Sequence, residues 1–374
     1  MFMHRDILPQ VIFSPAVLAI QLAEGVQNLG ANVTLFSPGP VDTSVQNITA
    51  DLSLFEQELR GRGYGYTELL KKHPVTFISL ARQVQAELIA KAFAMANAGE
   101  FDLVHIYTNE EDIALPFAQL CTKPTVFTHH DPFNFLIKYK NTFPKYKHLN
   151  WISMSLAQRA GMPPDTNWVA NIYHGLDKQA FRPEYQPNSD YVLYLGRIIE
   201  PKGVHLAIEA MQRYNQKAAK PLQLKIAGKH YAGHKDAYWG ERIQPQVDGQ
   251  EISYVGFVGD REAKQKLLAG ARAVLVPSTF AEPFGMVVIE ALACGTPVIG
   301  LDSGAIPEIV QDGKTGFVVD KQADDHQTAA ALAAALENIG AIRRQDCRAA
   351  FEQRFTLQRM CQEHLDAYVR VLAT

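Results

Sequence analysis

The chain has 374 residues, of which 47% are hydrophobic and 20% are charged, and its formal net charge is -3. This size and composition are typical of a globular protein with two domains, each with its own core. They do not favour a polyanion-binding protein, and no apolar stretch is long enough for a membrane-spanning helix. The four cysteines are scattered without metal-ligand spacing, so we expect reduced thiols in a soluble, cytoplasmic protein.

In the first half of the chain, short β-branched runs alternate with helical patterns. The expected strands are residues 33–36, 103–107, 125–128, 151–155 and 169–173. A further strand is barely visible within residues 1–8. Strands that are apolar throughout and alternate with helices predict parallel sheets covered on both faces.

The second half repeats this alternation after a turn-rich segment, residues 182–189. Its expected strands are residues 191–195, 222–227, 252–255, 273–277, 298–301 and 317–319, and residues 357–372 have helical apolar spacing. The sequence therefore predicts an α/β protein with two doubly wound, Rossmann-like domains, residues 1–183 and 184–355, with a hinge near residue 184. Residues 356–374 are expected to form a C-terminal helix that packs back on the first domain. Because such sheets bind ligands beyond the carboxyl ends of their strands, we expect the site in a cleft where the two domains face each other.

The segment from Thr279 to Gly300 is the most informative in the chain. It places two acids, Glu282 and Glu290, eight residues apart around a Pro-Phe-Gly turn. The proline and glycine predict that the helix begins after Glu282, over residues 286–294. The first N–H groups of a helix attract phosphate, so a diphosphate with polar groups on both sides fits this layout.

Three motifs resemble those of the retaining GT-B glycosyltransferases of family 4. They are the Glu282/Glu290 spacing, the run from Gly196 to Gly203 and the run from Asp302 to Glu308. The resemblance covers residues 167–320 almost continuously and is thinner in the first half. It implies a GT-B fold and sugar transfer from a nucleoside-diphosphate-sugar, most simply a UDP-sugar, by a metal-independent front-face mechanism.

Arg197 and Lys202 follow an expected strand in a glycine-containing turn, where two cations can stabilise a departing diphosphate. The resemblance assigns them this role, although a solvated turn is the simpler alternative. The resemblance also makes Glu290 the ribose ligand. The alternative is a glutamate on the helix surface that forms an ion pair. Glu282 then holds the hydroxyl groups of the transferred sugar, unless it only complements the positive helix start. The backbone amides that share this task are those of Phe284, Gly285 and Met286.

Weaker signals complete the expected site. Backbone groups around Val258 resemble the base-binding loop of the family, and Gly228 and Lys229 end the preceding strand and could line the same cleft. His130 ends an apolar strand and matches a histidine that contacts the donor sugar, although a strand-end histidine is often structural. His129 precedes His130, and two adjacent histidines also suggest a metal site. No further ligand has metal-site spacing and no Asp-x-Asp pair occurs, so we expect no metal.

One departure from the family concerns the Gly-Gly loop that usually follows the first strand. Its position here falls at Phe13-Ser14, without a glycine. Either residues 9–15 serve in its place, or the start of the chain is trimmed. A silent nucleotide-sugar-binding protein is therefore one alternative function, and a nucleotide-sugar 2-epimerase of the same fold is another.

Residues 138–148 are rich in lysine and aromatic residues. Such a stretch can contact an anionic membrane surface or hold an acceptor, whereas most charge runs are solvated. We expect the nucleotide-sugar donor and a sugar, lipid or other hydroxyl acceptor as partners. No nucleic-acid-binding motif accompanies the basic stretch. The protein would be cytoplasmic, with peripheral contact to the inner face of the membrane as a variant of this expectation.

Overall fold

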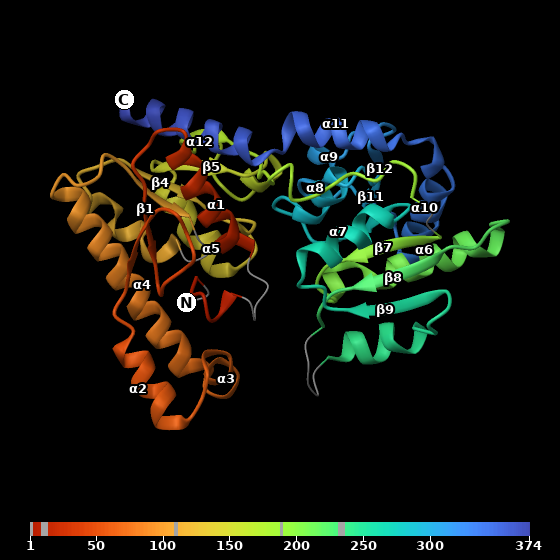
Figure 1. The fold of residues 1–374 in the computed structure, drawn as a ribbon, viewed down its shortest axis with the longest axis horizontal. Coiled ribbons are helices and arrows are strands. Elements are labelled where there is room, and N and C mark those ends of the chain that lie inside the picture. The colour runs from red at the N-terminus through yellow and green to blue at the C-terminus, as the bar shows by residue number, and fades with distance from the viewer. Residues whose placement is uncertain (1–2, 9–13, 108–110, 188–189, 231–235) are drawn as a thin grey trace. The chain divides into compact units, whose positions relative to one another are not determined.

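The computed structural model describes residues 3–8, 14–107, 111–187, 190–230 and 236–374, which form two compact units (Figure 1). Unit 1 contains residues 1–154, 159–172 and 357–374, and unit 2 contains residues 155–158 and 173–356. The domain boundaries expected near residues 184 and 356 remain predictions. Each unit is described separately below.

Unit 2 is built on a six-stranded parallel sheet with the strand order β12-β11-β10-β7-β8-β9. Its strands are β7 (Tyr191–Leu195), β8 (Gln223–Ala227), β9 (Ile252–Gly256), β10 (Val274–Val276), β11 (Val298–Leu301) and β12 (Gly316–Val319). All six expected strands are present, with bounds that differ by at most a residue or so. In chain order this is the 3-2-1-4-5-6 arrangement of dinucleotide-binding sheets, in which the order reverses between β7 and β10.

Helices connect the strands of unit 2. They are α6 (Val204–Lys217), α7 (Arg261–Gly270), α8 (Met286–Ala293), α9 (Ile306–Ile309), α10 (Asp325–Glu337) and α11 (Arg344–Arg354). Short turns of helix are η6 (Glu200–Lys202), η7 (Tyr238–Ile243), η8 (Gln244–Gln246) and η9 (Ile339–Ala341). The predicted start of α8 is confirmed, because Gly285 precedes it with φ +111°, a conformation that favours glycine.

Unit 1 contains a four-stranded parallel sheet and a separate parallel pair, β1 with β2. The strands of the sheet are β3 (Val104–Tyr107), β4 (Thr125–Thr128), β5 (Asn150–Ser153) and β6 (Trp168–Asn171), in that order. The pair is β1 (Thr34–Ser37) and β2 (Gln46–Thr49). The sequence pattern did not predict β2, because the sequence of this strand is largely polar. Residues 4–7 form a bend and turns in place of the strand sought there, and Phe13 and residues 9–12 lie outside the described residues.

The helices of unit 1 include the last segment of the chain. They are α1 (Ser14–Asn28), α2 (Ser53–Arg62), α3 (Tyr66–Lys72), α4 (Pro74–Asn97), α5 (Ile137–Thr142) and α12 (Leu357–Leu372), with η2 (Glu111–Ile113), η3 (Leu115–Leu120) and η4 (Phe143–Tyr146). A further turn, η5 (Ala157–Arg159), lies where the chain passes between the units. The predicted bounds of α12 are confirmed. It packs closely on α1, because a Cβ atom on Gly25 would lie 2.2 Å from Cys361 Sγ.

The core of unit 1 is a cluster of fully buried aromatic side chains around β4 and β5. Phe127, Phe133, Phe143 and Trp151 are each 0% exposed. Rings of this size supply much of the apolar area that a small sheet can bury. Within the described part of the chain, no helix combines the length and the apolar character needed to cross a bilayer.

Candidate functional site

Two loops of unit 2 meet where the strand order reverses. One follows β7 and carries Lys202, and the other follows β10 and carries Glu282. The N–H groups of Thr279 and Phe280 both donate to the carbonyl oxygen of Pro201, at 2.9 and 3.1 Å. Since ligands of doubly wound sheets bind at this point of the carboxyl edge, the two loops form the centre of a candidate binding site.

Gly203 allows the two loops to approach each other. Its φ is +70°, and a Cβ atom there would lie 2.0 Å from the carbonyl oxygen of Pro277. A larger residue would therefore meet both the backbone strain of the left-handed region and a direct clash. The glycine after Lys202 is a packing requirement of the site.

Lys202 and Glu282 form an ion pair, in which Lys202 Nζ donates to Glu282 Oε1. Their side chains are 17% and 10% exposed, respectively. Removal of one partner from such a pair leaves a poorly solvated charge, which is costly unless another group replaces it. The structure thus brings one predicted cation and one predicted acid into direct contact.

A third loop, which follows β11, holds the backbone of Glu282. Gly304 has φ +59°, and a Cβ atom there would lie 2.2 Å from the Glu282 carbonyl oxygen. The N–H of Ala305 donates to this oxygen at 2.8 Å, and Ser303 Oγ donates to the Phe280 carbonyl at 2.7 Å. From the sequence, Gly304 could be interpreted only as a turn glycine, whereas the structure shows that it allows a close backbone contact beneath Glu282.

The start of α8 follows directly after Glu282. Phe284 is buried and its ring lies edge-on to that of His174, with the ring centres 4.9 Å apart. Gly285 then allows the turn into Met286, the first residue of α8. Helix geometry leaves the first N–H groups of α8 without partners inside the helix, and these groups attract negative charge.

Glu290 lies on α8, is 8% exposed and accepts a hydrogen bond from Lys264 Nζ at 2.6 Å. Lys264 comes from α7, whose start is capped by Asp260. The alternative interpretation of Glu290 was a surface acid in an ion pair. The ion pair is present, but the acid is buried. Sequence analysis missed Lys264; the capping aspartate places it in the first turns of α7, but only the packing of α7 on α8 identifies its partner.

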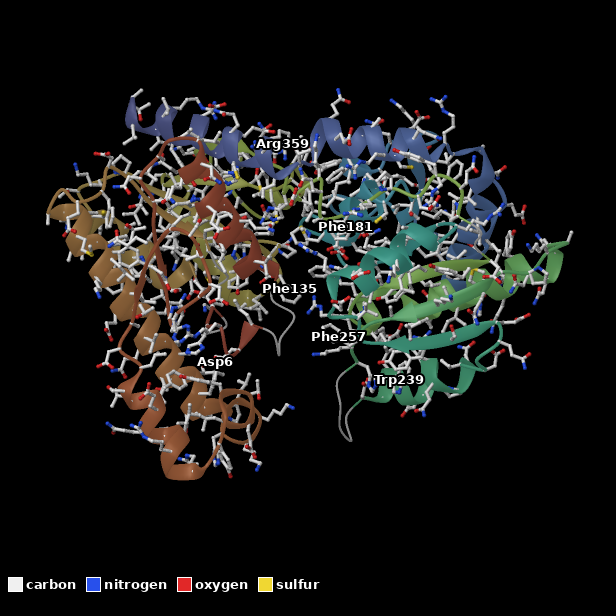
Figure 2. The ribbon with its side chains drawn as sticks, viewed as in Figure 1. Asp6, Phe135, Phe181, Trp239, Phe257 and Arg359 are labelled. Carbon is white, nitrogen blue, oxygen red and sulfur yellow. The ribbon has the colours of Figure 1, made fainter. Side chains whose placement is uncertain are left out.

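The loops after β8 and β9 lie beside the loop after β7. A Cβ atom on Gly228 would lie 1.8 Å from the Gly196 carbonyl oxygen, so only glycine fits there. Lys229 Nζ lies 4.0 Å from the ring centre of Phe257, an exposed residue of the β9 loop that is labelled in Figure 2. Val258 follows Phe257 and is partly buried. The three predicted residues of these loops are thus at the same carboxyl edge as Lys202.

Arg197 is exposed in the loop after β7. Its carbonyl oxygen accepts a hydrogen bond from Tyr194 Oη at 2.7 Å, and the next N–H, that of Ile198, donates to the Lys229 carbonyl at 2.8 Å. Burial raises the pKa of Tyr194 well above its usual value, so this hydroxyl stays a hydrogen-bond donor. The backbone of Arg197 is held, while its guanidinium reaches solvent.

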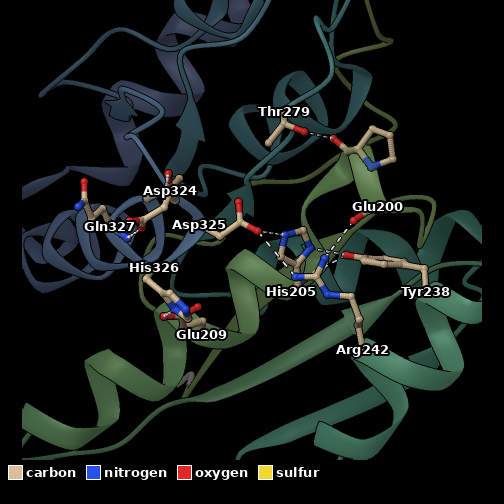
Figure 3. Close-up of polar contacts among 12 residues, drawn as sticks. Glu200, His205, Glu209, Tyr238, Arg242, Thr279, Asp324, Asp325, His326 and Gln327 are labelled. Atoms are coloured by element: carbon tan, nitrogen blue, oxygen red, sulfur yellow. Dashed lines mark hydrogen bonds and ion pairs between the residues drawn. The ribbon is translucent and has the colours of Figure 1, made fainter.

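A polar network supports the turn that presents Lys202 (Figure 3). Arg242, from η7, contacts Glu200 at 3.0 Å and Asp325 at 3.7 Å. His205 contacts Tyr238 at 2.8 Å and Asp325 at 3.2 Å. Burial, and next the charge of Arg242, lower the pKa of His205, so the neutral ring is favoured near neutral pH. The network ties η6, which contains Lys202, to η7 and to the start of α10.

Glu308, the last residue of the third motif, has a structural task. Its carboxylate accepts hydrogen bonds from the N–H groups of Leu156 and Ala157, at 2.8 and 2.6 Å, and from Tyr173 Oη at 3.0 Å. A carboxylate has enough acceptor sites for all three. Glu308 thus anchors residues 155–158 within unit 2.

His130 lies in unit 1, directly after β4 and its neighbour His129. It is 8% exposed, and its ring lies edge-on to that of Tyr107 with the centres 4.5 Å apart. Its assignment to the donor sugar remains a prediction. Among the described residues no three His, Cys, Asp or Glu side chains are grouped as metal ligands would be.

Neutral histidine rings and hydroxyl groups join β3 and β4 to α12. His105 shares one hydrogen bond with Tyr368 Oη at 2.7 Å and another with Thr128 Oγ1 at 2.9 Å. His364 Nδ1 donates to the Met360 carbonyl at 2.8 Å. Burial lowers the pKa of His364 to about 4 and that of His105 well below its usual value, so both rings are neutral at pH 7.

Part of the chain is similar in sequence to known families and proteins. Residues 177–354 match the family described as "Glycosyl transferases group 1". The phosphatidyl-myo-inositol mannosyltransferase of Mycobacterium tuberculosis is 28% identical over 262 residues, which cover 64% of this chain and 66% of that protein. The match therefore spans slightly less than two thirds of that relative's length.

Solved structures extend the likeness to nearly the whole chain. Sucrose-phosphate synthase from Thermosynechococcus elongatus matches with a TM-score of 0.70 at 20% identity, over 96% of this chain and 93% of that one. Anabaena Alr3699/HepE, solved in complex with UDP, matches with a TM-score of 0.68 at 18% identity, over 94% and 96%. These likenesses confirm the expected α/β fold of the GT-B class.

Proposed function

Because residues 177–354 match the family described as "Glycosyl transferases group 1", we propose that this protein transfers a sugar from a nucleoside-diphosphate donor to an acceptor hydroxyl. The observation that carries the proposal is the contact of Lys202 with Glu282 where the strand order of unit 2 reverses. A cation and an acid at this point suit a ligand that carries both phosphate and hydroxyl groups.

The donor diphosphate binds Arg197, Lys202 and the start of α8. An ammonium group has three donors, so Lys202 can keep Glu282 and still bind a phosphate oxygen. Negative charge grows on the diphosphate as the sugar leaves, and cations already held in place stabilise that charge. Gly203 and the network of Arg242 hold Lys202 in place, so both serve the chemical step.

The two acids bind hydroxyl groups on either side of the diphosphate. Glu282 accepts hydrogen bonds from the transferred sugar, together with the amides of Phe284, Gly285 and Met286. Glu290 accepts hydrogen bonds from the ribose. An ionised carboxylate has about four acceptor sites, so Lys264 leaves Glu290 free to bind the ribose as well. The base lies against Val258, Gly228 and Lys229.

Transfer proceeds with retention of configuration by a front-face reaction. The bond from the anomeric carbon to the diphosphate breaks while the acceptor oxygen bonds to the same face of that carbon. The departing phosphate oxygen takes the acceptor proton, so no protein nucleophile is needed. His130 contacts the donor sugar. Since Arg197 and Lys202 supply positive charge, we expect turnover to persist in EDTA.

The donor is a UDP-sugar, for which the Alr3699/HepE structures solved with UDP and with UDP-glucose give support by analogy. A thermal-shift screen across UDP-, GDP- and ADP-sugars tests this, because a ligand that binds the folded state raises its melting temperature. We expect stabilisation by UDP-sugars alone; stabilisation by GDP- or ADP-sugars alone would refute the donor assignment.

Donor turnover with a panel of hydroxyl acceptors tests the reaction, and the anomeric configuration of the product tests retention. Release of ManNAc from UDP-GlcNAc without an acceptor would instead indicate the 2-epimerase. Tight UDP binding without turnover of any donor would indicate the silent binding protein. Either result would refute sugar transfer while leaving the fold and the donor site intact.

A further inference from the structure

Three consecutive apolar side chains are exposed where the chain enters α5 in unit 1. Phe135, Leu136 and Ile137 are 54%, 42% and 84% exposed, and Phe135 is labelled in Figure 2. We call these residues the apolar tip. Single exposed apolar residues are common, but a contiguous group indicates a surface with a binding role.

The apolar tip is held in place by the core beneath it. Tyr139 and Phe143, on the opposite face of the segment, are buried, and both rings lie against that of His129 with centres 4.8 and 4.6 Å apart. The N–H of Lys140 donates to the Leu136 carbonyl at 2.9 Å. Tyr139 of α5 and Phe143 of η4 therefore pack into the core, while the tip stays at the surface.

The same segment is strongly basic. Residues 132–164 contain four lysines and Arg159 but no Asp or Glu, although the chain as a whole is slightly negative. Lys138 pairs with Asp112 at 2.8 Å, and Lys147 pairs with Asp165. Lys140 and Lys145 are exposed. Lys140 follows Ile137 by three residues, so both lie on one face of α5.

These observations change the interpretation of residues 138–148 as a face of alternating lysines and aromatics. Tyr139 and Phe143 turn inward, and two of the lysines are used in ion pairs within the unit. The apolar component of the surface lies instead at residues 135–137, just before the basic stretch. The surface therefore combines an apolar tip with lysines along its edge.

We propose that the apolar tip inserts into the interface of an anionic lipid membrane while Lys140 and Lys145 contact its headgroups. An exposed apolar group next to exposed lysines matches the boundary between acyl chains and negative headgroups. The tip begins seven residues after β4 ends, on the loops that also carry His130. The contact would thus hold the carboxyl edge of unit 1 at the membrane surface, and it does not depend on the proposed sugar transfer.

Co-sedimentation of the full chain with vesicles tests the contact. We expect binding to phosphatidylcholine vesicles that contain phosphatidylglycerol, weaker binding to pure phosphatidylcholine, and weakening by salt. Ile137→Ser and Phe135→Ser should each lower the partition coefficient roughly tenfold or more, since each removes a large apolar group that the membrane would bury. Lys140→Glu should lower it about fivefold or more, because one cation is lost and an anion is added.

Val75→Ser is the matched control, because Val75 at the start of α4 is 82% exposed, like Ile137. Thermal unfolding of each variant checks that it remains folded. The proposal is wrong if the unchanged chain does not bind the anionic vesicles, or if Val75→Ser weakens binding as much as Ile137→Ser. Absence of vesicle binding, together with a dimer that Ile137→Ser dissociates, would assign the tip to a second copy of the chain.

Discussion

The carboxyl edges of the two main sheets differ in their chemistry. In unit 2 the edge carries ion pairs, Lys202 with Glu282 and Lys264 with Glu290. In unit 1 the corresponding edge carries His130, whose buried ring packs against that of Tyr107. Buried charge is costly unless it is paired or meets a charged ligand. We therefore expect unit 2 to bind the diphosphate and unit 1 to contact the uncharged parts of the ligands.

The strongest test of the charged edge is removal of Lys202. In Lys202→Met we expect kcat to fall about 10²–10³-fold, because a preorganised charge for the departing diphosphate is lost. Steady-state kinetics with the cognate donor measure this, with the exposed Lys266→Met on α7 as the control. If kcat of Lys202→Met equals that of the control, the assigned role of Lys202 is wrong.

The second pair is expected to act on binding. Glu290→Ala should weaken UDP binding by about 1.5–3 kcal/mol, the usual contribution of hydrogen bonds to a charged group. Calorimetry measures this, with the exposed Glu262→Ala as control. A double-mutant cycle with Lys264→Met should give a coupling energy of about 0.5–3 kcal/mol. Unchanged UDP affinity in Glu290→Ala would remove Glu290 from the ribose site.

The close approach of the loops after β7 and β10 at Gly203 can be tested with two glycines of equal φ. Gly203 and Gly313 both have φ +70°, but only at Gly203 would a Cβ atom meet another backbone. Gly313→Ala should cost about 1–2 kcal/mol of the free energy of unfolding from backbone strain alone. Gly203→Ala should cost about 1–3 kcal/mol more from overpacking. Urea unfolding gives both values, and equal losses would show that the loops can separate without penalty.

The buried ring of His364, on α12 in unit 1, predicts a dependence of stability on pH. Burial lowers the pKa of His364 to about 4, whereas the usual value is 6.5. Between these values the unfolded chain binds a proton that the folded chain does not, so stability falls as the pH falls from about 6.5 to about 4. The slope is about 1.4 kcal/mol per pH unit for this group.

Unfolding of His364→Gln as a function of pH checks this slope. We expect a shallower decline in the variant, and part of the remainder is due to His105 and His205, whose pKa values are also lowered by burial. His326→Gln is the control, because His326 is exposed and its pKa is raised by Glu209. A decline in His364→Gln as steep as in the unchanged protein would contradict the assignment.

Features set by local pattern could be predicted from the sequence. The strands Tyr191–Leu195 and Val298–Leu301 and the helix Leu357–Leu372 have the predicted bounds. Their apolar periodicity and flanking turn residues lie within a few positions of one another. Glu282 and Glu290 were selected in the same way, from a spacing around a Pro-Phe-Gly turn; their roles with the donor remain predictions.

Contacts between segments that are distant in the sequence were decided by the tertiary structure. Lys264 lies 26 residues before Glu290, and the polar strand β2 is recognisable only through its pairing with β1. The exposure of Ile137 and the burial of Tyr139 depend on which face of α5 meets the aromatic core. Local sequence determines whether a segment is a helix, a strand or a turn, but contacts between segments depend on how their surfaces fit together. That fit creates the ion pairs of unit 2 and leaves the apolar tip of unit 1 uncovered.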